Sequence, residues 1–162
     1  MKQTRWVVMG ASGCGKSTVG QALAAAMAVP FIEGDQFHPP ANVAKMSAGF
    51  ALDDADRGDW LLALRAQIEQ AEGGLVLACS SLKRKYRDQL RLADPALHFA
   101  HLSGDRALIA SRMRERAGHY MPLSLLDSQL RDLEPLQVDE AGMVLDILLP
   151  PRVLVARILA GF

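Results

Sequence analysis

Eight residues near the start of the chain have the types and the spacing of a phosphate-binding loop. They run from Gly10 to Ser17 and match the pattern G-x-x-x-x-G-K-[ST]. Glycines let backbone N–H groups turn towards phosphate oxygens, Lys16 adds a cation at the β- and γ-phosphates, and the Ser17 hydroxyl can ligate Mg²⁺. The sequence therefore predicts that a nucleoside triphosphate binds with Mg²⁺, through Gly10, Ala11, Ser12, Gly13, Cys14, Gly15, Lys16, Ser17 and Thr18.

A glycine-rich turn that binds no ligand is the alternative interpretation of this string. It is disfavoured because the string follows a predicted strand at 6–9 and precedes a predicted helix, as phosphate binding at a helix N-terminus requires. The motif does not identify the phosphoryl acceptor, since GTPases, ATPases and small-molecule kinases share it.

Polar residues after the second and third predicted strands are candidates for binding the acceptor. Asp35 and His38 follow the second strand, and Lys83 and Arg87 follow the third. Ligands of an open parallel sheet collect at the carboxyl ends of its strands. A carboxylate facing the γ-phosphate can accept a proton from an attacking hydroxyl or orient it, so Asp35 is a catalytic candidate. The alternatives are an ordinary turn aspartate and ordinary surface cations. Cations here would suit an acceptor with its own negative charge.

A third group of basic residues lies further along the chain. Arg112 and Arg116 are one helical turn apart and share a face, and a mobile insertion is expected at 118–122. Arginines on a segment that closes over the phosphates would neutralise charge during transfer and exclude water. We therefore expect Arg112 to contact the nucleotide and Arg116 to be catalytic, the alternative being an exposed basic helix end.

Short apolar runs alternate with helical patterns, which is typical of a parallel α/β sheet. Strands are expected at 6–9, 31–33, 75–79, 99–102 and 143–147. A polar loop is expected at 53–59 before a helix that starts near Trp60, and Ser103 is expected to be the N-cap of the helix that follows the fourth strand. No repeat or linker is evident, so the chain is predicted to be one domain, 1–162.

Composition and charge exclude several classes of protein. The 162 residues contain 18 Lys and Arg and 18 Asp and Glu, and this balance argues against a nucleic-acid or anionic-membrane partner. No apolar run is long enough to cross a bilayer, and the start of the chain lacks a signal-peptide pattern. Two cysteines, Cys14 and Cys79, are too few for a disulfide scaffold, so we expect a cytoplasmic protein.

From Val8 to about Asp146 the chain resembles the gluconate kinases, small P-loop sugar kinases related to shikimate and adenylate kinases. The distinguishing blocks follow the second strand and are more specific than the phosphate loop. They are Gly34-Asp35-Gln36-Phe37-His38-Pro39, then Asn42, Lys45-Met46 and Gly49, then Leu52, Asp54, Asp56-Arg57 and Trp60-Leu61, with further matches at 79–87 and 104–119.

The resemblance implies a P-loop kinase fold, three α/β/α layers around a five-stranded parallel sheet in the order 2-3-1-4-5, with a small lid at about 114–130. It implies ATP-dependent phosphorylation of D-gluconate at its terminal hydroxyl, a Mg²⁺ requirement and commonly a homodimer. By analogy Asp35 is the base or orients the hydroxyl, and Arg112 and Arg116 belong to the lid over ATP. The sugar acid would be held by Asp35, His38, Arg57, Lys83, Arg87 and His119.

The chain departs from the family pattern at Ala51 and Asp59, where proline is usual, and Cys79 and Ser80 replace the usual Mg²⁺-positioning aspartate. We therefore expect water-mediated Mg²⁺ contacts that could include Asp35. Three alternatives stay open: a related kinase acting on shikimate or a nucleoside monophosphate, a nucleotide-dependent switch protein, and a nucleic-acid kinase, which neutral charge and few aromatic residues disfavour.

Overall fold

The protein is described here by a computed structural model that covers residues 4–115 and 122–161. Within them, five parallel strands form one sheet in the order β2-β3-β1-β4-β5, which confirms the expected order. At its centre, Val7 of β1 lies opposite Leu77 of β3 and Phe99 of β4. The strands are β1 (Arg5–Met9), β2 (Phe31–Glu33), β3 (Leu75–Ala78), β4 (His98–Ser103) and β5 (Gly142–Asp146).

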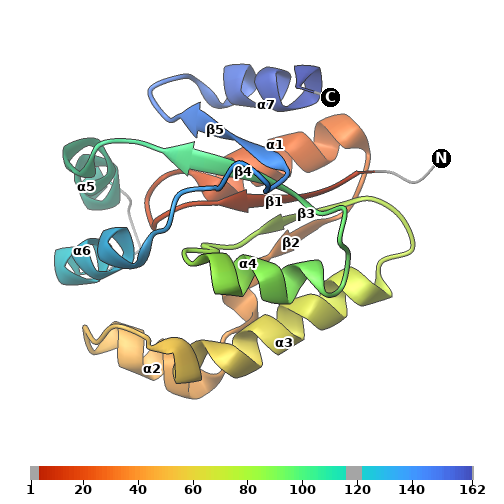
Figure 1. Ribbon diagram of the computed structural model, residues 1–162. Helices are drawn as coiled ribbons and strands as arrows, with labels where there is room; N and C mark the ends of the chain where they lie inside the picture. Colours follow the sequence, from red (N-terminus) through yellow and green to blue (C-terminus); the bar gives the residue numbers. More distant parts are fainter. Residues whose placement is uncertain (1–3, 116–121, 162) are drawn as a thin grey trace.

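Helices cover both faces of the sheet (Figure 1). In that view α1 and α7 lie above the sheet, α3 and α4 lie below it, and α5 and α6 lie beyond the carboxyl ends of the strands. A short 3-10 helix, Gly34–Phe37, follows β2. The helices are α1 (Lys16–Met27), α2 (Pro40–Ser47), α3 (Asp54–Gln70), α4 (Arg84–Arg91), α5 (Arg106–Glu115), α6 (Leu123–Asp132) and α7 (Pro151–Ala160).

Each face of the sheet has its own hydrophobic core because side chains alternate along a strand. On β1, Val8 packs with Leu23 and the residues of the α1 and α7 side, whereas Val7 packs with Leu64 and Leu90 on the α3 and α4 side. A strand buried on both faces is a continuous apolar run, as the sequence of β1 predicted.

Helix α3 begins at Asp54, so the prediction of a polar loop at 53–59 was wrong. Asp53 and Asp56 form a capping box, in which each side chain accepts a hydrogen bond from the other's backbone N–H, at 2.8 and 2.9 Å. The first turn of α3 contains polar residues without apolar residues at helical spacing. The sequence pattern therefore indicated a helix only from Trp60 onward.

The predicted N-cap role of Ser103 was also wrong. Ser103 is the last residue of β4 and pairs with Asp146 of β5. Helix α5 starts three residues later, at Arg106, and the carbonyl of Asp105 accepts the hydrogen bond from Ile109 N. Among the described residues, no helix combines the length and the apolar content that crossing a membrane requires.

Candidate active site

The phosphate-binding motif forms the turn between β1 and α1. Gly10 has φ +145°, and a Cβ at this position would lie 2.7 Å from the carbonyl oxygen of Leu102, so only glycine fits. Lys16 Nζ donates hydrogen bonds to the carbonyls of Gly10 and Ala11, both at 3.0 Å. The ammonium group therefore lies over its own loop, where it can exchange a carbonyl for a phosphate oxygen.

The Ser17 hydroxyl donates a hydrogen bond to the carboxylate of Glu33, the last residue of β2. The same carboxylate accepts from the backbone N–H of Asp35. A hydroxyl and a carboxylate are oxygen donors of the kind Mg²⁺ prefers, so the residues present fit this ion. Sequence reasoning missed Glu33; its place at the carboxyl end of a strand was the available signal.

A cavity of about 140 Å³ continues from the phosphate loop towards the acceptor candidates. It brings together five predicted site residues from distant parts of the sequence: Ser12, Lys16, Asp35, His38 and Arg57. Ser80, two residues after β3, also lines the cavity, as do three residues of α6. The complete lining is Ser12, Lys16, Asp35, His38, Met46, Ala51, Leu52, Arg57, Trp60, Ser80, Leu125, Ser128 and Gln129.

His38 is fixed beside Asp35 by aromatic stacking. Its ring lies on the indole of Trp60 with centroids 4.2 Å apart, and the indole N–H donates to the carbonyl of Gly34 at 2.8 Å. His38 Nε2 lies 4.0 Å from an Asp35 carboxylate oxygen, and the Asp35 side chain is 72% exposed. Burial lowers the pKa of His38 although Asp35 opposes the shift, so the imidazole is neutral at pH 7 and can donate or accept a hydrogen bond.

Arg57 is a buried cation in the cavity wall. Its Nη1 donates to the hydroxyl of Tyr86 at 2.8 Å and to the carboxylate of Asp132 at 3.3 Å. The Tyr86 hydroxyl in turn donates to Asp54. Desolvation and the bond to Asp54 raise the pKa of Tyr86 to about 12, so this hydroxyl stays protonated. The arrangement can present a fixed guanidinium to an anionic acceptor.

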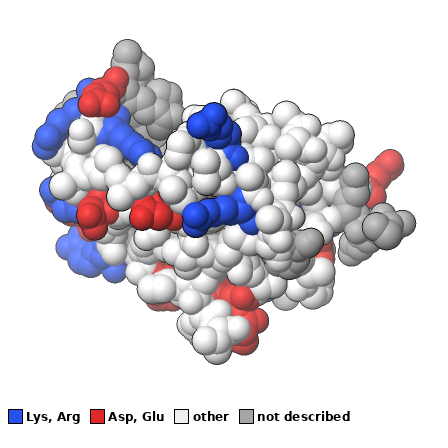
Figure 2. Space-filling model, turned by 90° about the horizontal axis from the view of Figure 1, so that it is seen from above, with Lys and Arg blue, Asp and Glu red and all other residues white. Residues whose placement is uncertain are grey.

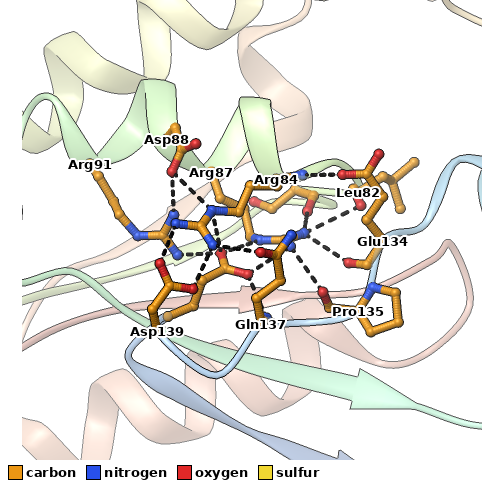
Figure 3. Close-up of polar contacts among 11 residues, drawn as sticks. Leu82, Arg84, Arg87, Asp88, Arg91, Glu134, Pro135, Gln137 and Asp139 are labelled. Carbon is orange, nitrogen blue, oxygen red and sulfur yellow. Dashed lines mark hydrogen bonds and ion pairs between the residues drawn. The ribbon is translucent and has the colours of Figure 1, made fainter.

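The structure does not bring Lys83 or Arg87 to the cavity lining. Lys83 Nζ pairs with Asp54 at 3.1 Å and lies over the ring of Tyr86. The side chain of Arg87 is fully buried and makes a two-pronged ion pair with Glu140, at 2.7 and 3.0 Å. Figure 3 shows its guanidinium surrounded by oxygens of the protein itself. Arg87 therefore does not fit the expected role of holding the sugar acid.

Of the predicted lid residues, Arg116 and His119 lie outside the described residues. Arg112, on α5, donates from Nη2 to the carbonyl of Ile147 at 2.6 Å, which ties α5 to the segment after β5. The range 123–130 lies in α6, where Leu126 is fully buried in the core and Leu125 lines the cavity. Within the range predicted as a lid, Leu125, Ser128 and Gln129 of α6 line the cavity.

Figure 2 views the molecule from above the orientation of Figure 1. It shows basic side chains gathered at the left end, where α5 and α6 lie, with acidic side chains among them. Helix α5 supplies Arg106, Arg112 and Arg114, and Arg106 pairs with Asp127 of α6. Charge at this end is therefore concentrated locally although the chain is neutral as a whole.

Comparison with known proteins identifies the family. The shikimate kinase family model matches residues 12–134. A gluconokinase of Gluconobacter oxydans is 51% identical over 132 residues, which cover 79% of this chain and 74% of that protein. The thermosensitive gluconokinase of Escherichia coli is 45% identical, with 86% and 76% covered. The chain belongs to the gluconokinase family.

Solved structures agree with this membership in the gluconokinase family. The crystal structure of a gluconokinase from Sinorhizobium meliloti matches with a TM-score of 0.90 and 45% identity, covering 98% of this chain and 90% of that one. A shikimate kinase from Bacteroides thetaiotaomicron matches with a TM-score of 0.70 at 19% identity, with 98% and 99% covered, and so shares the fold.

Proposed function

We propose that this protein transfers the γ-phosphoryl group of ATP to the terminal hydroxyl of D-gluconate, giving 6-phospho-D-gluconate and ADP. Gluconokinases of 51% and 45% identity support the reaction. The observation that carries the proposal is that one cavity is lined both by phosphate-loop residues and by Asp35, His38 and Arg57. A polyhydroxy acid needs such a lining, because it has many hydroxyls to satisfy and one carboxylate to neutralise.

Asp35 acts as the base or orienting group in the proposed transfer. Its exposed carboxylate accepts the proton of the terminal hydroxyl while that oxygen bonds to the γ-phosphorus and the bond to the β–γ bridging oxygen breaks. Lys16 stabilises the charge on the phosphates. Mg²⁺, held at the Ser17 hydroxyl with Glu33 beside it, would supply further neutralisation of the phosphate oxygens.

Arg57 binds the carboxylate at the other end of gluconate. It is already fixed by Tyr86 and Asp132, so little side-chain entropy is lost when the acceptor binds. The neutral imidazole of His38 bonds a hydroxyl between the two ends. Binding of the carboxylate by Arg57 and of the terminal hydroxyl by Asp35 would favour an acid phosphorylated at the end remote from its carboxylate.

We also propose the finer properties that the family resemblance implies. These are one kinase domain over 1–162 with a lid, a homodimer, and a cytoplasmic location. Light scattering of the purified protein tests the dimer, which a monomeric mass would rule out.

ADP release measured with gluconate, shikimate and nucleoside monophosphates as acceptors tests the function. We expect turnover that depends on gluconate and Mg²⁺ together. Equal ADP release without any acceptor would favour a nucleotide switch, and turnover with shikimate alone would assign shikimate kinase activity instead.

A further inference from the structure

Helix α6 contacts both halves of the site through two side chains one turn apart. Gln129 accepts a hydrogen bond from the backbone N–H of Ser12 in the phosphate loop, at 2.7 Å from its Oε1. Asp132 accepts a hydrogen bond from Arg57, at 3.3 Å. Residues three apart share a helix face, so one surface of α6 spans the distance between the phosphate loop and the acceptor cation.

The packing of α6 makes it a firm support for these contacts. Its side chain Leu126 is fully buried in the core on the α1 and α7 side of the sheet. The chain just after α6 is bound to the start of α4 and the residues before it: the Glu134 N–H donates to the Leu82 carbonyl at 2.7 Å, and the Glu134 carboxylate accepts from Arg84 N at 2.9 Å (Figure 3). The Glu134 carbonyl also accepts from Arg87. The position of Gln129 and Asp132 is therefore set by the fold and not by the exposed surface.

The chemistry of the two contacts differs. Both hydrogen bonds that Arg57 makes within the described residues use Nη1, which leaves Nε and Nη2 to bind a carboxylate with two parallel bonds. The contact at Ser12 instead fixes one backbone amide of the loop, and a loop with its amides already oriented binds phosphate without reorganisation.

We propose that Gln129 and Asp132 are positioning residues, Asp132 acting through Arg57 on the acceptor and Gln129 acting through Ser12 on the nucleotide. The acceptor half rests on the proposed function. The two effects are separable: the Asp132 contact governs the KM for gluconate, and the Gln129 contact governs the affinity for nucleotide even when no acceptor is present.

Asp132→Asn and Gln129→Met test the proposal, because they preserve side-chain size while removing the charge and the acceptor. We expect Asp132→Asn to raise the KM for gluconate about tenfold, with kcat within about twofold and ADP affinity unchanged. We expect Gln129→Met to weaken ADP binding about tenfold in calorimetry without acceptor.

Matched controls lie at exposed positions. Asp127→Asn makes the same change on α6, where Asp127 pairs with Arg106, and Gln89→Met makes the same change at an exposed glutamine of α4. Both should leave KM and ADP binding unchanged, and melting temperatures should verify that all four variants fold.

Each result decides one half of the proposal. A KM for gluconate that does not change in Asp132→Asn, or that changes equally in Asp127→Asn, overturns the acceptor half. ADP binding that is unchanged or tighter in Gln129→Met overturns the nucleotide half. If the wild-type enzyme shows no gluconate-dependent turnover, the proposed function fails together with the acceptor half, while ADP binding still decides the role of Gln129.

Discussion

Replacing Glu140 with glutamine should destabilise the protein strongly and leave its kinetics unchanged. The carboxylate of Glu140 is fully buried and receives hydrogen bonds from Arg87, Arg91 and the backbone N–H of Gln137. Glu140→Gln would remove the charge but not the volume, so the guanidinium of Arg87 would remain buried without its counter-ion.

Two estimates give the size of the decrease in the free energy of unfolding. Removing one partner of a buried ion pair costs about 3–5 kcal/mol. Burial alone would raise the pKa of Glu140, but the hydrogen bonds from Arg87, Gln137 N and Arg91 outweigh it and lower that pKa from 4.5 to about 2. This difference corresponds to about 3 kcal/mol. For a domain of this size, about 2–4 °C per kcal/mol predicts a melting temperature lower by about 10 °C.

The pH dependence has a definite sign. The pKa of Glu140 is lower in the folded protein than in the unfolded chain. Its contribution to folding stability is therefore fully present above about pH 4.5 and is lost as the pH falls through about 2. Glu140→Gln should therefore be less stable than the wild type at pH 7, and the difference should shrink in acid.

Calorimetric or circular-dichroism melts of Glu140→Gln and of Asp139→Asn would measure the effect. Asp139 pairs with Arg84 at the surface, 63% exposed, so the control should melt within a few degrees of the wild type. At a temperature where the variant is folded, the KM for gluconate should be within about twofold of the wild-type value. A normal melting temperature combined with a tenfold higher KM would refute the structural assignment and return Arg87 to the acceptor site.

Four further changes give distinct outcomes. Lys16→Ala should abolish ATP-dependent turnover in the ADP-release assay, because the cation at the phosphates is lost. Asp35→Asn should lower kcat at least about a hundredfold while changing ADP affinity little, because general-base catalysis contributes at least this factor. Asp59→Asn, at an exposed position, is the control. Glu33→Gln should raise the Mg²⁺ concentration needed for half-maximal activity, since a carboxylate beside the Ser17 hydroxyl is lost. The melting temperature of the wild type should fall below about pH 6.5, and His101→Leu should make this fall smaller. Burial, with Arg87 nearby, lowers the pKa of this histidine, so only the unfolded chain takes up the proton.

Local patterns were enough to predict the parts of the site that follow directly from a strand. The phosphate loop comes after β1, and Asp35 comes two residues after β2. Such residues reach the carboxyl edge of a parallel sheet whatever packs around them. The order of the strands followed from the family resemblance, and the buried character of β1 and β3 followed from their apolar runs.

Contacts between distant parts of the chain could not be predicted in this way. Ser12 and Gln129 are 117 residues apart, and Arg57 and Asp132 are 75 apart, so no local pattern relates them. Arg87 shows the opposite error: its position after β3 suggested a ligand contact, but its side chain points to Glu140. A helix residue can face the site or the core, and the sequence of α4 does not distinguish these directions by itself.

The nucleotide and the acceptor are bound by different elements of the site, which explains how one fold can serve different acceptors. In the proposed reaction the phosphate loop, which lies between β1 and α1, binds the nucleotide that kinases of this fold have in common. The acceptor half is assembled from the 3-10 helix, α3 and α6, and the chain just after α6 is bound to α4 by the hydrogen bond from Arg87 to the Glu134 carbonyl. Shikimate kinase shares the fold at 19% identity. A change of acceptor within the fold should therefore require substitutions on α3 and α6, around Arg57 and Asp132, while the phosphate loop can stay unchanged.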